Sequence, residues 1–176
     1  MDADNFKNSH DIIIDLVNKF NNNDGFVREK ARLALIDMGG EAVPFLNKAL
    51  SHNQEQVRWE AAKTLVKIAN PGSIASLIKA LQDEIFDIRW LAAEALIAIG
   101  AESIKPLLAA LVDESKELFL RQGAHHVIKD IIHQNPKESE LNEILKSVES
   151  ALDSTVPSIT VSGSAKSALE KLKTLS

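Results

Sequence analysis

The sequence predicts an all-α protein built from stacked helical hairpins, and three observations support this fold class. Of the 176 residues, 45% are apolar and only 5% are aromatic, and Ala, Leu, Ile, Glu and Lys are abundant, as is typical of helical proteins. An arginine-containing motif recurs four times. The apolar residues in and after each motif follow helical spacing. We therefore expect about four hairpins with a half unit at each end, roughly ten helices, in one domain over residues 1–176.

The first helix of each hairpin is marked by an apolar residue followed by arginine and, three residues later, by alanine. The four copies begin at Val27, Val57, Ile88 and Leu120. Their arginines are 30, 31 and 32 residues apart, at Arg28, Arg58, Arg89 and Arg121. A regular period of this length is the signature of a repeat architecture. Because each arginine lies beside the first core residue of its helix, a structural role is favoured over a phosphate-binding column.

A second helix is predicted after each of the first three motifs. The segments EAVPFLNKAL, GSIASLIKAL and ESIKPLLAAL each carry one apolar stripe at helical spacing. The repeats are therefore expected at residues 23–51, 52–82 and 83–112. A divergent fourth repeat is expected at 113–152. The interval from Leu111 to Arg121 is ten residues, two more than the corresponding interval in the earlier units.

Both ends of the chain match half units that would cap the stack. Residues 11–22 carry the second-helix pattern and are expected to form an N-terminal capping helix. Residues 163–176 repeat the first-helix pattern and are expected to form a C-terminal capping helix with a polar outer face. The residues of that pattern are Ala165, Ala168, Leu169 and Leu172. Residues 153–163 are predicted to be the longest connection and a mobile one.

The pattern apolar-Arg-x-x-Ala, closed in two units by a glycine such as Gly39, resembles the short HEAT-like repeat of phycobilisome lyases. The resemblance is strong over residues 11–112 and weaker over 113–176. It implies a right-handed α-solenoid with first helices on the convex side and second helices on the concave side. It also implies that the motif arginines join neighbouring units through acidic or carbonyl partners in the preceding loop. Asp24 and Asp87 fit the acidic role.

Composition narrows the classes of partner and cofactor. The net charge is −5, whereas a nucleic-acid surface needs an excess of Lys and Arg, so nucleic acid is disfavoured. Cysteine is absent, which excludes disulfides, Cys-ligated zinc and thiol catalysis. The N-terminus carries acids instead of a positively charged leader, and no apolar run reaches the roughly 20 residues that span a bilayer. We expect a cytoplasmic protein that binds neither a membrane nor a cofactor.

The exposed positions of the second helices form a candidate surface for a protein or peptide partner. Asn18, Lys48 and Lys79 lie in one row, and Phe45 and Ser76 lie in the next. An exposed Phe45 would be an anchor for a partner, and the two lysines could meet an acidic segment. Ordinary solvated side chains on a concave face would give the same pattern.

Two tryptophans occupy equivalent positions one unit apart. Trp59 and Trp90 each follow a motif arginine, and neighbouring helices would place them about 10 Å apart. They could grip a peptide or a base. Packing of each ring along the neighbouring unit is the interpretation we favour.

The fourth motif contains the most irregular residues. His126, Asp130 and His133 share one helix face, but they span about 10 Å, too far to hold one ion easily. His125 stands where the earlier units have alanine, and Gly123 indicates a close backbone approach or a weakened helix. His125 and His126 are therefore candidate partner-binding residues. Metal binding at His126 and His133 is one alternative, and an ordinary solvated convex face is the other, which is favoured for His126.

Three functions follow from these residues. The first is a non-catalytic scaffold or adaptor that binds a protein on its concave face. The second, implied by the resemblance, is an accessory subunit of a lyase-type enzyme acting on a chromophore or a modified protein. The third is a metal-dependent activity in the fourth repeat. No nucleophile–base constellation and no glycine-rich phosphate loop is recognisable, so catalysis is not expected.

Overall fold

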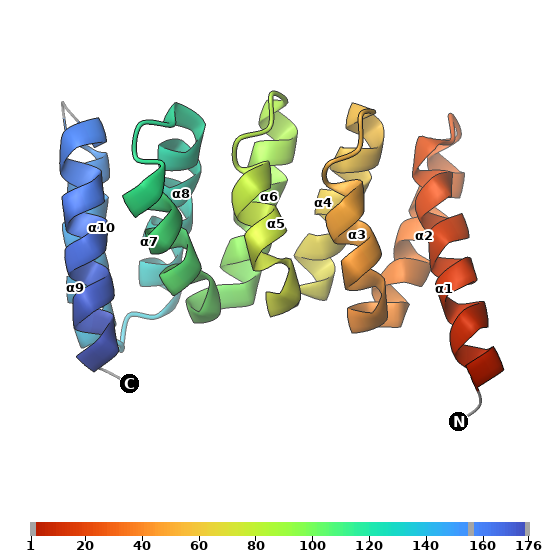
Figure 1. The fold of residues 1–176 in the computed structure, drawn as a ribbon, viewed down its shortest axis with the longest axis horizontal. Helices are drawn as coiled ribbons and strands as arrows, with labels where there is room; N and C mark the ends of the chain where they lie inside the picture. The colour runs from red at the N-terminus through yellow and green to blue at the C-terminus, as the bar shows by residue number, and fades with distance from the viewer. Residues whose placement is uncertain (1–2, 155–156, 175–176) are drawn as a thin grey trace.

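A computed structural model describes residues 3–154 and 157–174, and these residues form ten α-helices and four short 3-10 helices without any β-strand (Figure 1). The α-helices are α1 (Ala3–Asn18), α2 (Gly25–Met38), α3 (Val43–Ala49), α4 (Glu55–Ile68), α5 (Ile74–Ala80), α6 (Phe86–Ile99), α7 (Ile104–Asp113), α8 (Leu118–Gln134), α9 (Ser139–Leu152) and α10 (Pro157–Thr174). The 3-10 helices are η1 (Lys19–Asn21), η2 (Gly39–Ala42), η3 (Pro71–Ser73) and η4 (Gly100–Ser103). The predicted all-α fold is confirmed.

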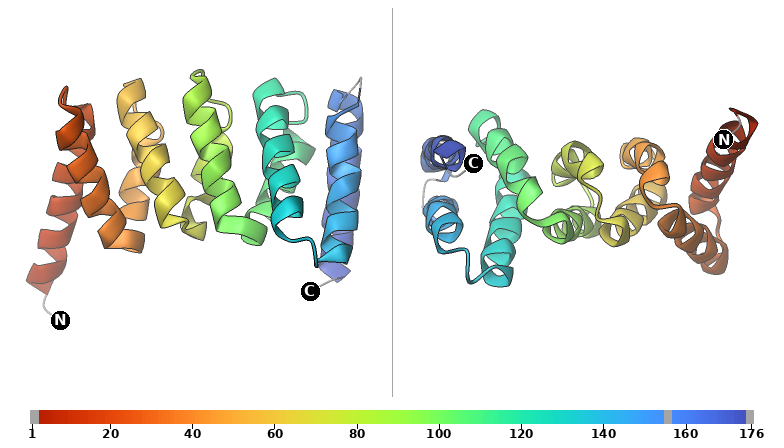
Figure 2. Two further views of the ribbon diagram at one scale, coloured as in Figure 1. Left: turned by 180° about the vertical axis from the view of Figure 1, so that it is seen from behind. Right: turned by 90° about the horizontal axis from the view of Figure 1, so that it is seen from below.

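The helices stand in two rows, and the two ends of the chain lie at opposite ends of the stack (Figures 1 and 2). One row, which we call the first-helix face, contains α2, α4, α6, α8 and α9. The other row, the second-helix face, contains α1, α3, α5, α7 and α10. Successive first helices pack directly on each other, as α4 does on α6 and α6 on α8. This arrangement is the predicted solenoid.

Left-handed residues end the first helices of the three regular units. Gly39 ends α2 with φ of 58°, and Gly100 ends α6 with φ of 82°. Both angles lie in the region that a glycine reaches without a steric penalty. Ala69 takes the same place after α4, with φ of 48°. Each such residue turns the chain into a 3-10 turn that leads to the second helix.

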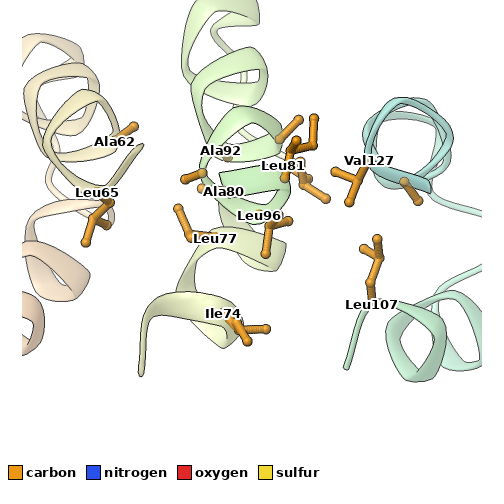
Figure 3. Packing of buried hydrophobic residues seen from close by; sticks show 14 of the residues in the cluster. Ala62, Leu65, Ile74, Leu77, Ala80, Leu81, Ala92, Leu96, Leu107 and Val127 are labelled. Carbon is orange, nitrogen blue, oxygen red and sulfur yellow. The ribbon is translucent and has the colours of Figure 1, made fainter. Parts of the chain in front are cut away.

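The core is one continuous apolar layer between the two rows (Figure 3). Leu77, Leu96 and Leu107 are completely buried there. Burial of one such leucine contributes about 1.5–3 kcal/mol to folding. The motif alanines, such as Ala61 and Ala92, are also buried, and their small side chains let adjacent first helices approach closely.

The C-terminal part of the stack differs from the prediction. α9 packs on α8, whereas α10 packs on α7 and α9, so α10 stands in the second-helix row and not in the first (Figure 2). α8 ends at Asn135 with φ of −120°, without the left-handed residue of the regular units. α9 therefore stays in the first-helix row beside α8, and the chain crosses to the second-helix row only with α10. The two helices of the last hairpin are thus inverted relative to the prediction.

α10 also begins earlier than expected. Its first residue is Pro157, inside the segment 153–163 that was predicted to be a mobile connection. Residues 155 and 156 of that segment lie outside the described part of the chain. Within α10, Ser162 Oγ donates a hydrogen bond of 3.0 Å to the carbonyl of Val112, which ties the new helix to the end of α7.

One stretch of the stack is apolar enough, by length and composition, to cross a membrane. It is Phe86–Asp113, with a mean hydropathy of 1.8 in its most apolar window. The chain folds this stretch back on itself as α6, η4 and α7. Most of its apolar side chains belong to the core shared with the neighbouring units, whereas Phe86 and Trp90 at its start are exposed.

Candidate partner-binding surfaces

The four motif arginines make the same pair of hydrogen bonds. Arg58 Nη1 donates to the carbonyls of His52 (3.0 Å) and Asn53 (3.3 Å), six and five residues earlier. The other three arginines make the equivalent bonds to their own preceding loops: Arg28, Arg89 and Arg121. One guanidinium nitrogen of each arginine thus donates hydrogen bonds to two carbonyls of the preceding loop, which have no partner within a helix.

Two of these arginines, Arg28 and Arg58, also bind carboxylates of the next unit. Arg58 Nε and Nη2 bind the carboxylate of Asp83 at 2.7 and 3.1 Å. This bidentate hydrogen bond raises the pKa of the already buried Arg58 guanidinium. Arg28 Nε binds Glu60 at 3.0 Å, and Arg32 forms a second ion pair with the same carboxylate. Glu60 is only 2% exposed.

The two aspartates assigned to this acidic role have other positions. Asp24 is the N-cap of α2, and its side chain accepts a hydrogen bond of 2.9 Å from the backbone N–H of Phe26. Asp87 is exposed in the first turn of α6. Neither forms an ion pair with an arginine in the described part of the chain.

A mainly apolar groove of about 500 Å³ lies between α1 and α3 on the second-helix face. It brings together three of the predicted residues, Asn18, Phe45 and Lys48. Its other lining residues are Ile14, Val17, Pro44, Ala49 and His52. Phe45 is half-buried there, in edge contact with the His10 ring at 5.3 Å, so it forms part of the groove wall instead of standing free.

Ser76 and Lys79 line a second groove, of about 610 Å³, around α5. This groove is more polar than the first: Arg58 and Asp83 contribute to it, and Gln82 Nε2 donates a hydrogen bond of 2.7 Å to Glu114, another of its lining residues. The residues predicted as one surface therefore lie in two separate grooves on the same face.

The tryptophans of the first-helix face have different neighbours. Trp90 stacks on the imidazole of His126 with ring centroids 4.4 Å apart, and His126 Nε2 lies 3.1 Å from Glu94 Oε1. Trp59 instead lies under the amine of Lys63, 4.4 Å from the ring centre. No ring contact joins Trp59 to Trp90 among the residues that the structure describes.

Sequence reasoning missed two phenylalanines beside Trp90. Phe86 lies 6.3 Å from Trp90 between ring centroids. The guanidinium carbon of Arg89 lies 3.9 Å from the Phe119 ring centre and 5.6 Å from that of Phe86. Phe86 stands three residues before its motif arginine, at a position that varies between units. Phe119 stands two residues before Arg121, a position that only the first unit also fills with phenylalanine, at Phe26, so the repeat pattern did not single them out.

The histidines of α8 do not form a metal centre. His125 points toward α9, with Nε2 3.4 Å from Asp153 and 4.0 Å from Glu149. His126 is occupied by Trp90 and Glu94, and His133 is exposed. Over residues 3–154 and 157–174, no three His, Cys, Asp or Glu side chains are placed to hold an ion.

Comparison with known proteins adds a family to this geometry. The family model described as HEAT repeats matches residues 13–96 and 43–129, which together cover more than half of the chain. No curated protein matches this chain. A crystal structure of an engineered protein is 22% identical with a TM-score of 0.43, covering 93% of this chain and 79% of that chain. A second engineered protein is 23% identical with a TM-score of 0.43, over 90% of this chain and 80% of that chain. A third is 23% identical with a TM-score of 0.42, over 92% of this chain and 47% of that chain. The repeat match and the solenoid architecture together show that the chain belongs to the HEAT repeat family.

Proposed function

We propose that this chain is a non-catalytic scaffold that binds a segment of another protein in the groove between α1 and α3. The observation that carries the proposal is the combination of an apolar groove with an uncommitted cation at its edge. Ile14, Val17 and Phe45 supply the apolar wall. Lys48 is exposed at its rim and makes no ion pair within the described part of the chain.

The groove suggests the chemistry of the partner. An apolar side chain of the partner would contact Ile14 and Phe45, because burial of apolar surface is the main source of affinity in such grooves. An acidic side chain would meet Lys48. Lys79 offers a second exposed amine one unit further along the same face.

The repeat spacing sets the distance between acidic residues of the partner. Neighbouring helices lie about 10 Å apart, and an extended chain advances about 3.3 Å per residue. An extended segment that reaches both Lys48 and Lys79 would therefore carry two acidic residues about three positions apart. The apolar anchor would precede or follow them, over the α1–α3 groove.

Site-specific photocrosslinking tests this proposal. A benzophenone amino acid replaces Asn18, which is exposed at the groove, and in a matched control it replaces Leu33, which is exposed on α2 in the other row. We expect a crosslinked protein from position 18 and none from position 33. The crosslinked peptide should contain an apolar residue near two acids. Crosslinks from position 33 alone, or from neither position, would contradict the proposal.

An accessory role in a lyase-type enzyme is the second candidate function. It is supported by the short spacing of 30 to 32 residues between the motif arginines, the feature that carries the resemblance to phycobilisome lyases. Co-expression with a bilin-bearing protein, with and without this chain, distinguishes it from the scaffold. Unchanged pigment attachment would eliminate this second candidate.

A further inference from the structure

An exposed aromatic cluster covers the start of α6 and α8 on the first-helix face, opposite the proposed groove. Its members are unusually exposed for large apolar side chains: Phe86 62%, Trp90 47%, Leu118 54% and Phe119 39%. Single exposed apolar residues are normal on protein surfaces, but a contiguous group marks an interaction site.

Contacts within the chain orient the side chains of the aromatic cluster. Arg89 lies between the rings of Phe86 and Phe119, and its Nη1 is fixed by the carbonyls of Asp83 (2.7 Å) and Glu84 (3.0 Å). Trp90 is fixed by its stack on His126. A surface that is already ordered loses little conformational entropy on binding, which favours affinity.

Acidic side chains border the aromatic cluster. Asp87 and Glu117 are exposed. Glu84 is also exposed but pairs with Arg58 at 3.2 Å, and the half-buried Glu94 lies 3.1 Å from His126 Nε2. Cations are also near the cluster: Arg89 is engaged by two rings and two carbonyls, Lys116 is exposed, and Arg58 pairs with Glu84. A cation at such a surface is attracted both by the carboxylates and by the faces of the aromatic rings, which carry partial negative charge.

We infer that the aromatic cluster is a second docking surface, which takes a protein segment carrying both arginine and aliphatic side chains. The aliphatic side chains cover Phe86, Leu118 and Phe119, and the guanidinium groups lie on the rings and reach the bordering carboxylates. This inference does not rest on the proposed function, because it uses the opposite row of helices. With both surfaces occupied, the chain would bridge two partners of opposite charge.

A synthetic peptide of alternating leucine and arginine pairs is the probe. The full chain with Trp59→Phe is labelled with nitrogen-15, so that the single indole N–H signal reports Trp90. We expect this signal to move on titration. A peptide with glutamate in place of arginine, and a peptide of arginine and glycine without leucine, should leave it in place.

Variants locate the binding of the probe. Phe86→Ala with Phe119→Ala should weaken it at least tenfold, as should Asp87→Asn with Glu94→Gln. Leu33→Ala removes an exposed leucine from α2 and should change it less than twofold. An unmoved Trp90 signal, or an equal response to the arginine–glycine peptide, overturns the inference. Two other results would also overturn it. Concentration-dependent dimerisation that is lost in Phe86→Ala would show that the surface binds a second copy of the chain. Sedimentation with anionic vesicles, without binding of the peptide, would show that it binds a membrane.

Discussion

Leu81, which ends α5, packs directly against the backbone of Gly123 on α8. A β-carbon at position 123 would lie 2.7 Å from Leu81 Cδ2 and 3.2 Å from its Cγ. Leu81 is completely buried, so a shift of its methyl groups would disturb the core packing around them. Gly123→Ala should gain about 0.5–1 kcal/mol of helix propensity but lose about 1–3 kcal/mol to overpacking. We expect a net loss of about 1 kcal/mol in the free energy of unfolding, measured in urea.

A matched control is available in α10. Gly163 is exposed, and a β-carbon there would meet nothing within 4 Å. Gly163→Ala should stabilise the protein by about 0.5–1 kcal/mol. Gly123→Ala should also become neutral or stabilising in a Leu81→Ala background, because the obstructing methyls are gone. Equal stabilisation by Gly123→Ala and Gly163→Ala would show that Leu81 does not restrict position 123.

The close approach at Gly123 illustrates what the sequence could and could not predict. A glycine in a helix where other units have Glu60 and Leu91 indicates a local constraint. Its partner, Leu81, belongs to another unit and becomes known only when the helices are stacked. The same limit applies to the arginines: their carbonyl partners are local, five and six residues away, but the carboxylate of Glu60 crosses units.

The C-terminal inversion could not be predicted from the apolar pattern. Residues such as Ala165 and Ala168 are buried as expected, but a helix in either row buries an equivalent stripe. What distinguishes the rows is the turn that ends the preceding helix. The α8 terminus lacks a residue with positive φ, but α4 makes the regular turn with Ala69 in place of a glycine, so the absence of a glycine from the sequence does not by itself identify the change.

Asp24 is predicted to stabilise α2 as a cap and not as a charge. Asp24→Ala should cost about 1 kcal/mol, because the backbone N–H of Phe26 loses its acceptor. Asp24→Ser removes the charge but keeps the acceptor, and it should cost only a few tenths of a kcal/mol. Thermal unfolding of both variants checks this. If Asp24→Ser lost as much stability as Asp24→Ala, the charge of Asp24 and not its capping hydrogen bond would be the source of the stabilisation.

Glu60 is predicted to be the most sensitive charged residue in the stack. Its side chain is 3% exposed, and it binds Arg28 and Arg32, whose side chains are 21% and 14% exposed. Glu60→Ala leaves two partly buried guanidinium groups without a counter-charge and should cost about 2–4 kcal/mol. Glu84→Ala removes an exposed carboxylate and should stay within about 0.5 kcal/mol of wild type. Urea unfolding that gives similar values for the two variants would contradict this assignment.

The stack of Trp90 on His126 gives an optical prediction. In a Trp59→Phe background, His126→Ala should expose the second face of the indole and move its fluorescence to longer wavelength. The loss of the stacked ring should cost about 0.5–1.5 kcal/mol. His133→Ala, on the same helix but exposed, should leave the emission of Trp90 unchanged. An unaltered spectrum in His126→Ala would show that the rings do not stack in solution.

The central claim is that the α1–α3 groove binds a protein segment, and the affinity of the crosslinked partner tests it most directly. The Kd of that partner, measured by calorimetry, is compared between wild type, Phe45→Ala and Lys48→Glu. Lys67→Glu, an exposed lysine on α4 in the other row, is the charge-matched control. We predict that Phe45→Ala and Lys48→Glu each raise the Kd at least tenfold, which corresponds to about 1.4 kcal/mol, and that Lys67→Glu changes it less than twofold. Equal Kd values for wild type and both groove variants would contradict the claim.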